Sequence, residues 1–388
     1  MNMRKISNEC VAWLCGPAAR LLLIGLAVML PGVSNAAQEY WVTGLGQLSD
    51  SYGTWANSIS DNGYVAGGGM TNVTGNTRGF LWQSPGPMQN LGTLSGDDYS
   101  MAYSVNASGH VAGNSSISFE SAGQAFLFNG TAMTGLGFLP GGAVSKAYGL
   151  NNSDQVVGYS EDAGGYATAF LWSGGLMQAL GTLPDNTILS TAYAINNAGV
   201  VVGEAAGLAT STPFIWDSVN GARSLEFLSG HNDGTAHDVN NASEVVGVSD
   251  HFAAEARAVL WDSAGVIHDL GLLPGATVSK ARGINDLSAV VGNDDRTEGA
   301  WVYDSAHGLR SLDDLIGDAT NTWQLTSASG INNAGQIVGS GFHNGQQEAF
   351  LLSPVPEPST SSLLGFALLM TASVRRRRCG CSMMRPLA

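Results

Sequence analysis

One twelve-residue pattern occurs seven times along this chain, and its regular period limits the possible folds more than any other feature. Each copy begins with Ala, has an apolar residue three positions later, and ends eleven positions after the Ala at a Gly, most often as Val-Val-Gly. A fixed period is typical of repeat proteins, in which each unit buries its apolar faces against its neighbours. The copies recur at intervals of 44 to 47 residues and begin at Ala56, Ala102, Ala147, Ala192, Ala236, Ala281 and Ala328.

Each period contains four segments typical of short β-strands. In the copy 192–203, β-branched residues flank an Asn- and Gly-rich break, which predicts a hairpin with a short loop. Two further apolar segments follow each hairpin, such as 169–172 and 177–183, and they are too short for helices. Four strands in about 45 residues are typical of one β-propeller blade, and four to eight blades close a ring. The sequence therefore predicts an all-β, seven-bladed β-propeller over residues 37–354.

The two ends of the repeat array complement each other. The segment 40–48 resembles the last segment of a repeat but has no hairpin before it, whereas the final repeat stops at Leu352 without that segment. We expect the N-terminal strand to complete the last sheet and close the ring, which would remove an exposed sheet edge.

Residues 1–36 have the features of a secretory signal peptide. Basic residues precede the apolar run 21–30, and a small-residue triplet ending at Ala36 follows it. We expect signal peptidase to cleave after Ala36. The alternative is an uncleaved anchor, although ten apolar residues are short for a membrane span.

Residues 355–388 contain three features in a fixed order. A Pro-Glu-Pro signature comes first, an apolar stretch over 361–374 follows, and a basic cluster comes next. This order resembles the PEP-CTERM sorting tail of Gram-negative bacteria that make extracellular polysaccharide. The resemblance implies transient anchoring in the inner membrane and removal of the tail by an exosortase, which would release the domain outside the cell or attach it there. The residues that carry the resemblance are Pro356, Glu357, Pro358, Arg375, Arg376, Arg377 and Arg378.

The tail departs from that pattern in two respects. Fourteen helical residues cover only about 21 Å of a hydrocarbon core of about 30 Å, and ten residues, 379–388, follow the basic cluster. The alternative is a hydrophobic tail that is not cleaved.

The repeats over about 40–352 also resemble extracellular HAF repeat proteins, a family named for a His-Ala-Phe triplet. Ala-Phe occurs in three copies here, at 125–126, 169–170 and 349–350, but His precedes it in none. The resemblance implies export and repetition, without an established activity.

Charge and cysteine content exclude several classes of function. Residues 37–354 contain 8 Lys and Arg against 29 Asp and Glu, a net charge of −21, which argues against nucleic-acid binding. The four cysteines, Cys10, Cys15, Cys379 and Cys381, lie near the ends, so the repeats contain neither a disulfide nor a thiolate metal site. We find no catalytic sequence motif and predict a non-enzymatic protein without a cofactor. Asp pairs at 97–98, 294–295 and 313–314 leave weak Ca²⁺ binding on loops open.

The residue after the repeated Ala varies in kind, whereas its neighbours hardly change. We expect this position to face solvent or a ligand, and Tyr103, Tyr148 and Tyr193 would then stack on sugar rings in the central channel. The alternative is that they are ordinary half-exposed strand residues. Across the seven copies the position holds Asn57, Tyr103, Tyr148, Tyr193, His237, Arg282 and Ser329.

These features predict a secreted repeat protein that is structural or adhesive at the cell surface or in the extracellular matrix of a biofilm. Signal peptidase and the exosortase would be its partners during export, and extracellular polysaccharide its partner outside. A carbohydrate-binding, lectin-like propeller is the main alternative, and a glycan-cleaving enzyme is the third.

Overall fold

The computed structural model describes residues 39–356 except 50, 72–75, 120, 182, 184–187, 208–209, 252–254, 298 and 318–321. The chain divides into two compact units, 1–37 and 38–388, and the first lies outside the described residues. The predicted cleavage site at Ala36 and the tail residues Glu357, Pro358 and 375–378 lie outside them as well. No helix in the described part is long and apolar enough to span a membrane.

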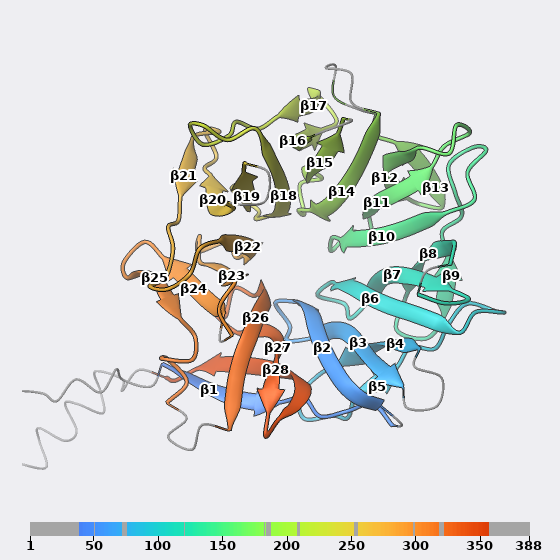
Figure 1. Cartoon of the computed structure of the whole chain (residues 1–388). Helices are drawn as coiled ribbons and strands as arrows, with labels where there is room; N and C mark the ends of the chain where they lie inside the picture. The colour runs from blue at the N-terminus through green and yellow to red at the C-terminus, as the bar shows by residue number, and fades with distance from the viewer. Residues whose placement is uncertain are drawn as a thin grey trace, which may run out of the picture. The chain divides into compact units, whose positions relative to one another are not determined.

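The described chain forms seven four-stranded antiparallel sheets around a common centre (Figure 1). We name each blade by its strands. The first three blades consist of β2 (Ser51–Ile59), β3 (Val65–Thr71), β4 (Thr77–Trp82) and β5 (Gln89–Asn90); β6 (Tyr99–Val105), β7 (Val111–Ser116), β8 (Gly123–Phe128) and β9 (Met133–Gly135); and β10 (Ser145–Leu150), β11 (Val156–Glu161), β12 (Ala167–Ser173) and β13 (Leu176–Ala179).

The next three blades consist of β14 (Leu189–Ile195), β15 (Val201–Ala206), β16 (Ser211–Asp217) and β17 (Gly221–Ser224); β18 (Asp233–Val239), β19 (Val245–Asp250), β20 (Arg257–Trp261) and β21 (Ile267–Asp269); and β22 (Ser279–Ile284), β23 (Val290–Asp294), β24 (Ala300–Asp304) and β25 (Gly308–Ser311). The last blade contains β26 (Trp323–Ile331), β27 (Ile337–His343), β28 (Gln346–Pro354) and the N-terminal strand β1 (Tyr40–Gly44). The predicted seven-bladed propeller is therefore confirmed.

The closure by the N-terminal strand is confirmed as well. β1 pairs antiparallel with β28, in a register that runs from Tyr40 opposite Pro354 to Gly44 opposite Phe350. The pairing extends one step further, because the Val355 N–H donates to the Glu39 carbonyl at 2.8 Å. Glu39 also receives two hydrogen bonds of 2.7 Å from Arg310 of the neighbouring blade.

The repeated twelve-residue pattern spans the end of the first strand of each blade, the turn that follows and the start of the second strand. In the β14–β17 blade, Ala192 lies opposite Gly203. A Cβ at Gly203 would collide with the carbonyl oxygen of Thr191, so the close approach of the two strands requires Gly at the end of the pattern.

The apolar core lies mostly between blades. One cluster combines Val202 and Leu225 of the β14–β17 blade and its exit loop with Val239 and Trp261 of the next blade. Each blade covers a face of the next, which one four-stranded sheet cannot do for itself.

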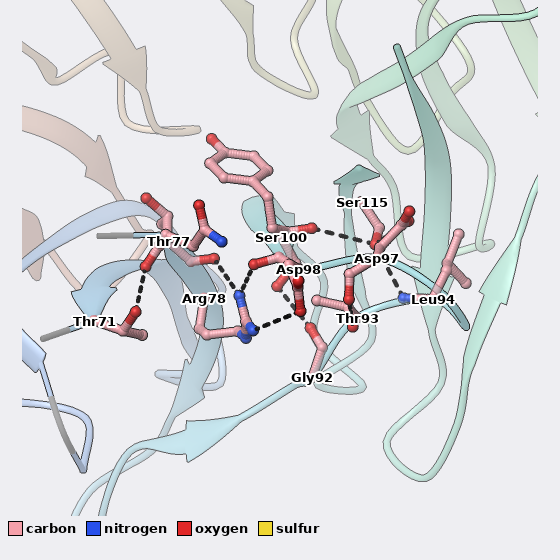
Figure 2. A network of polar contacts seen from close by, with 12 residues as sticks. Thr71, Thr77, Arg78, Gly92, Thr93, Leu94, Asp97, Asp98, Ser100 and Ser115 are labelled. Atoms are coloured by element: carbon pink, nitrogen blue, oxygen red, sulfur yellow. Dashed lines mark hydrogen bonds and ion pairs between the residues drawn. The ribbon is translucent and has the colours of Figure 1, made fainter. Parts of the chain in front are cut away.

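Buried hydroxyl groups fasten five of the seven blades to the blade and the loop that precede them. The Ser100 hydroxyl accepts a hydrogen bond from the Gly79 N–H at 3.0 Å. It donates to the Gly92 carbonyl at 2.6 Å, and both Ser100 and Gly92 are labelled in Figure 2. The Ser115 hydroxyl of β7 binds the same loop at two points. It donates to Asp97 at 2.7 Å and accepts a hydrogen bond from the Leu94 N–H at 3.0 Å. Four further residues make the same two contacts as Ser100, namely Thr54, Ser145, Ser190 and Ser279.

Six buried asparagines, which we call the Asn belt, connect the turns between the first two strands. In each, Oδ1 accepts hydrogen bonds from its own turn while Nδ2 donates to a backbone carbonyl in the next blade. Asn196 accepts from Ala198 and Val200 at 3.0 and 2.9 Å and donates to the Asn240 carbonyl at 2.9 Å. The belt consists of Asn106, Asn151, Asn196, Asn240, Asn285 and Asn332.

Ser60 takes the seventh position of this circle. Its carbonyl accepts from Asn332 at 3.1 Å, so the belt runs across the junction between the last blade and the first. Its hydroxyl accepts from the Tyr64 N–H of its own turn at 3.1 Å.

Deleting residues 37–50 should lower the free energy of unfolding by about 5 kcal/mol or more. The deletion removes β1 and two buried leucines, Leu45 and Leu48, and leaves β28 as an open edge. Denaturant unfolding measures the change, and a chain that ends after Pro356 is the matched control. Equal stability of the deletion variant and the control would contradict closure by β1.

Asn196→Ala should destabilise the ring by about 3 kcal/mol, because it leaves three backbone groups without their side-chain partner. The adjacent Asn197 is exposed and accepts one hydrogen bond, from the Asn152 N–H at 3.0 Å. Asn197→Ala should therefore cost about 1 kcal/mol or less. Urea unfolding of both variants compares them, and equal losses would show that burial of the belt does not matter.

Candidate functional site

The first strand of each blade borders the centre of the ring (Figure 1). Here the structure contains a cavity of about 250 Å³, the central channel. All seven variable residues that follow the repeated Ala line it, as the sequence predicted for a position facing solvent or a ligand: Asn57, Tyr103, Tyr148, Tyr193, His237, Arg282 and Ser329.

A β-bulge in every blade accounts for this orientation. In the β14–β17 blade, Ala192 pairs with Gly203 and Ala194 pairs with Val202, so Tyr193 has no partner across the strands. The same shift occurs after the repeated Ala in all seven blades. A bulged residue does not follow the regular alternation of side chains along the strand, so its side chain points in a different direction. As a result, one side chain per blade lies in the channel.

The three tyrosines form a continuous arc on one side of the channel. The ring centroids of Tyr103 and Tyr148 are 5.0 Å apart, those of Tyr148 and Tyr193 are 5.3 Å apart, and each side chain is half-buried. Burial raises the pKa of all three hydroxyls, so they stay protonated at neutral pH and can donate hydrogen bonds. Whether their rings stack on a sugar stays a prediction.

Glu204 of β15 fixes the end of this arc. Its Oε1 accepts a hydrogen bond from the Tyr193 hydroxyl at 2.7 Å, and its Oε2 accepts from the Thr235 hydroxyl of the next blade at 2.9 Å. The carboxylate therefore links two blades and holds Tyr193 in position.

The two blades that follow the tyrosine arc carry ionisable side chains, and the His237 ring centroid lies 6.1 Å from that of Tyr193. His237 contacts the Ala281 carbonyl through Nδ1 at 2.7 Å, so Nδ1 must carry the hydrogen. Burial, together with Arg282, lowers the pKa of His237 to about 3, and the imidazole is neutral at physiological pH. Burial also raises the pKa of Asp238 to about 6, although its carboxylate accepts a hydrogen bond from the Ile284 N–H at 2.9 Å.

The Asp pairs that left Ca²⁺ binding open have other partners in the structure. Asp97 accepts from Ser115 at 2.7 Å, Asp295 from the Thr277 N–H at 2.9 Å, and Asp313 from the Leu325 N–H at 3.1 Å. Among the residues that the structure describes, no group of three His, Cys, Asp or Glu side chains has a geometry that could hold a metal ion.

Sequence reasoning missed a second set of polar side chains. In three successive blades, an Asp at the end of the third strand or directly after it pairs with a basic residue six positions later on the fourth strand. The distances are 2.7 Å for Asp217 and Arg223, 3.0 Å for Asp262 and His268, and 2.8 Å for Asp304 and Arg310. The constant spacing of six residues between the Asp and the basic residue could have indicated these pairs from the sequence.

Comparisons with known proteins support the fold and no finer assignment. No family model matches the chain, and no curated protein matches it either. Among solved structures, it is similar to a streptogramin B lyase, at 10% identity and a TM-score of 0.54, over 82% of this chain and 99% of that one. It is also similar to the virginiamycin B lyase of Staphylococcus aureus, at 9% identity and a TM-score of 0.53, with the same coverage. At such identities the likeness concerns the β-propeller fold and does not decide between an enzyme and a binding protein.

The two ionisable neighbours in the channel should give opposite pH dependences of stability. The neutral His237 stabilises the fold above its ordinary pKa, and this contribution is lost as the pH falls. Asp238, whose pKa is raised, stabilises the fold below its ordinary pKa and loses this contribution as the pH rises through about 6. In the wild type the two effects oppose each other between about pH 4 and pH 6.

Single variants should separate the two effects. With Asp238→Asn, the free energy of unfolding should fall on acidification by about 1 kcal/mol more than in the wild type. With His237→Asn it should instead rise by a similar amount relative to the wild type. Asn suits this position, because Asn57 makes the equivalent bond to the Ala102 carbonyl at 2.8 Å. Urea unfolding at several pH values measures the slopes, and parallel profiles for all three proteins would contradict this account.

Proposed function

We propose that this chain is an exported, non-enzymatic propeller that serves as an adhesive or structural element at the cell surface or in the surrounding polysaccharide. The signal peptide and the sorting tail, both inferred from the sequence, would deliver it there. The acidic ring between them would remain soluble outside the cell and would repel other polyanions such as nucleic acids.

The observation that carries this proposal is the pairing of the first and last strands of the ring. β1 and β28 are paired in one blade, and the last backbone bond of the ring joins Val355 to Glu39. Pro356 follows directly and is exposed. Cleavage after Ala36 and near Pro356 would therefore remove both sorting segments without breaking a hydrogen bond between the described residues 39–355 of the ring.

Carbohydrate binding in the central channel is the second candidate. It is favoured by the arc of Tyr103, Tyr148 and Tyr193, whose half-buried rings offer apolar contact. The protonated hydroxyls of Tyr103 and Tyr148 can donate hydrogen bonds in the same place. Replacing the three tyrosines by Phe should then weaken binding to a glycan array while the ring stays folded.

The export proposal is tested by locating the protein in cells with and without the exosortase. We expect a processed form outside the cells that begins at Ala37 and lacks the tail, and a tailed form retained in the envelope when the exosortase is absent. Glu357→Ala should be retained in the same way, whereas Glu255→Ala, on the exposed surface of the ring, should be processed normally. Mass spectrometry of both termini measures this. Protein that reaches the outside with its tail intact in both strains would contradict the proposal.

A further inference from the structure

A cavity of about 410 Å³ lies between the β14–β17 blade and the β18–β21 blade, outside the central channel. One wall is formed by the end of β16, by β17 and by the loop that follows. The other wall is formed by the turn after β18 and the loop after β20. The volume is within the range of about 300–1,000 Å³ that is typical of small-molecule sites.

The floor of this cavity is apolar. Val200, Ile215, Leu225 and Val245 line it and belong to the core cluster between the two blades. Trp261 lies in the same cluster, is 0% exposed, and donates from Nε1 to the Glu226 carbonyl at 2.8 Å. The indole therefore supports the floor and fixes the loop after β17, and it is not itself a stacking surface.

The charged groups on the two walls are largely compensated by their own neighbours. Asp217 accepts from Asn220 and, at 2.7 Å, from Arg223, and these bonds lower its pKa to about 2. On the facing wall, Asp262 accepts from the Val266 N–H at 2.9 Å and pairs with His268. A ligand therefore has no need to supply a counter-charge to either aspartate.

Several lining groups retain hydrogen-bonding capacity. Arg223 uses only Nη2 in its bond to Asp217, and its side chain is 52% exposed. Within the described chain, the hydroxyls of Ser224 and Ser243 and the carboxylate of Glu226 make no hydrogen bond. The cavity thus combines an apolar floor with donors and acceptors around its walls.

We propose that this cavity, between β16–β17 and the β18–β21 blade, binds a neutral sugar unit. A pyranose has an apolar face, which fits the aliphatic floor, and a rim of hydroxyls that both donate and accept, which fits Arg223, Ser224 and Glu226. Three carboxylates line the site against one arginine, so uronic acids and other anions are disfavoured. This inference deepens the proposed adhesive function and depends on it only for the natural source of the sugar, the surrounding polysaccharide.

The equivalent groove between the last blade and the first provides an internal comparison. It has a cavity of about 260 Å³ beside Trp82, and its lining contains Gln83 where the other groove has Asp262, and Leu351 where the other has Ile215. No arginine lines it. The repeat therefore supplies the groove, and both grooves have polar linings, which in the second one include Asp61, Asn62 and Gln336. Arg223 and the larger cavity distinguish the groove between the β14–β17 and β18–β21 blades.

The experiment measures binding of neutral disaccharides to the purified full chain by saturation-transfer NMR, with maltose, cellobiose and diacetylchitobiose as probes and digalacturonic acid as the acidic comparison. We expect at least one neutral probe to bind with millimolar affinity and more tightly than the acidic one. Arg223→Gln should weaken this binding about tenfold, and Ser224→Trp, which fills the cavity, should abolish it. Gln83→Ala in the equivalent groove should leave it unchanged.

Thermal unfolding of each variant shows that the ring is intact. Absence of binding by all neutral probes, tighter binding of digalacturonic acid, or binding unaffected by Arg223→Gln would each overturn the proposal. Binding that survives Ser224→Trp but is lost with Tyr148→Ala would place the sugar in the central channel and overturn it as well. None of these results depends on export, so failure of this site and failure of the proposed delivery are distinguishable.

Discussion

The buried asparagine amide is the interaction on which the ring depends. Its Oδ1 closes the turn of its own blade and its Nδ2 holds a carbonyl of the next, so one side chain sets both the local conformation and the distance between blades. Asp has no donor for the second contact, and Ser is too short for it. Ser60 illustrates this limit, because its hydroxyl serves only its own turn. Leaving a buried donor or acceptor unpaired costs about 1–3 kcal/mol, which explains why the amide recurs blade after blade.

The Asn belt and the buried hydroxyls hold the blades together, and neither involves the residue that follows the repeated Ala. This position can therefore differ from blade to blade. The bulge after the repeated Ala places that residue in the channel, where it contributes little to the strand pairing around it. The seven residues differ accordingly: three tyrosines lie together in an arc, while His237 and Arg282 follow in the next two blades. A scaffold with seven nearly equal parts thus carries a channel with two chemically different sides.

The sequence was sufficient to predict the blades and their number, because these depend on patterns within about 45 residues. Closure could be predicted because the segment 40–48 matches the strand that the last repeat lacks. The Gly that ends each copy and the unmatched segment at 40–48 were the decisive signals. The contacts between blades could not be predicted in the same way. Ser100 has its partners in Gly79 and Gly92, on the preceding blade and its exit loop, and nothing in the spacing indicates that these atoms meet. The variable position was predicted to face solvent or a ligand, but the bond from the Tyr193 hydroxyl to Glu204 depends on the side-chain orientation at the bulge, which the spacing of the repeats does not indicate.

Because β1 pairs with β28, the ring reaches its full stability only when both the first and the last strand are present. Gly46 and Glu348, which are joined by a hydrogen bond of 2.9 Å, are separated by 302 residues, and bringing such distant segments together costs about 5 kcal/mol of chain entropy. That cost is recovered only after the final repeat has been made, since the first strand to be synthesised has no partner before then. A chain that stops one repeat early leaves β1 without its partner β28 and leaves two blade faces uncovered, which favours proteolysis or aggregation. Incomplete chains therefore differ from complete ones in their own stability, and no other protein is needed to distinguish them.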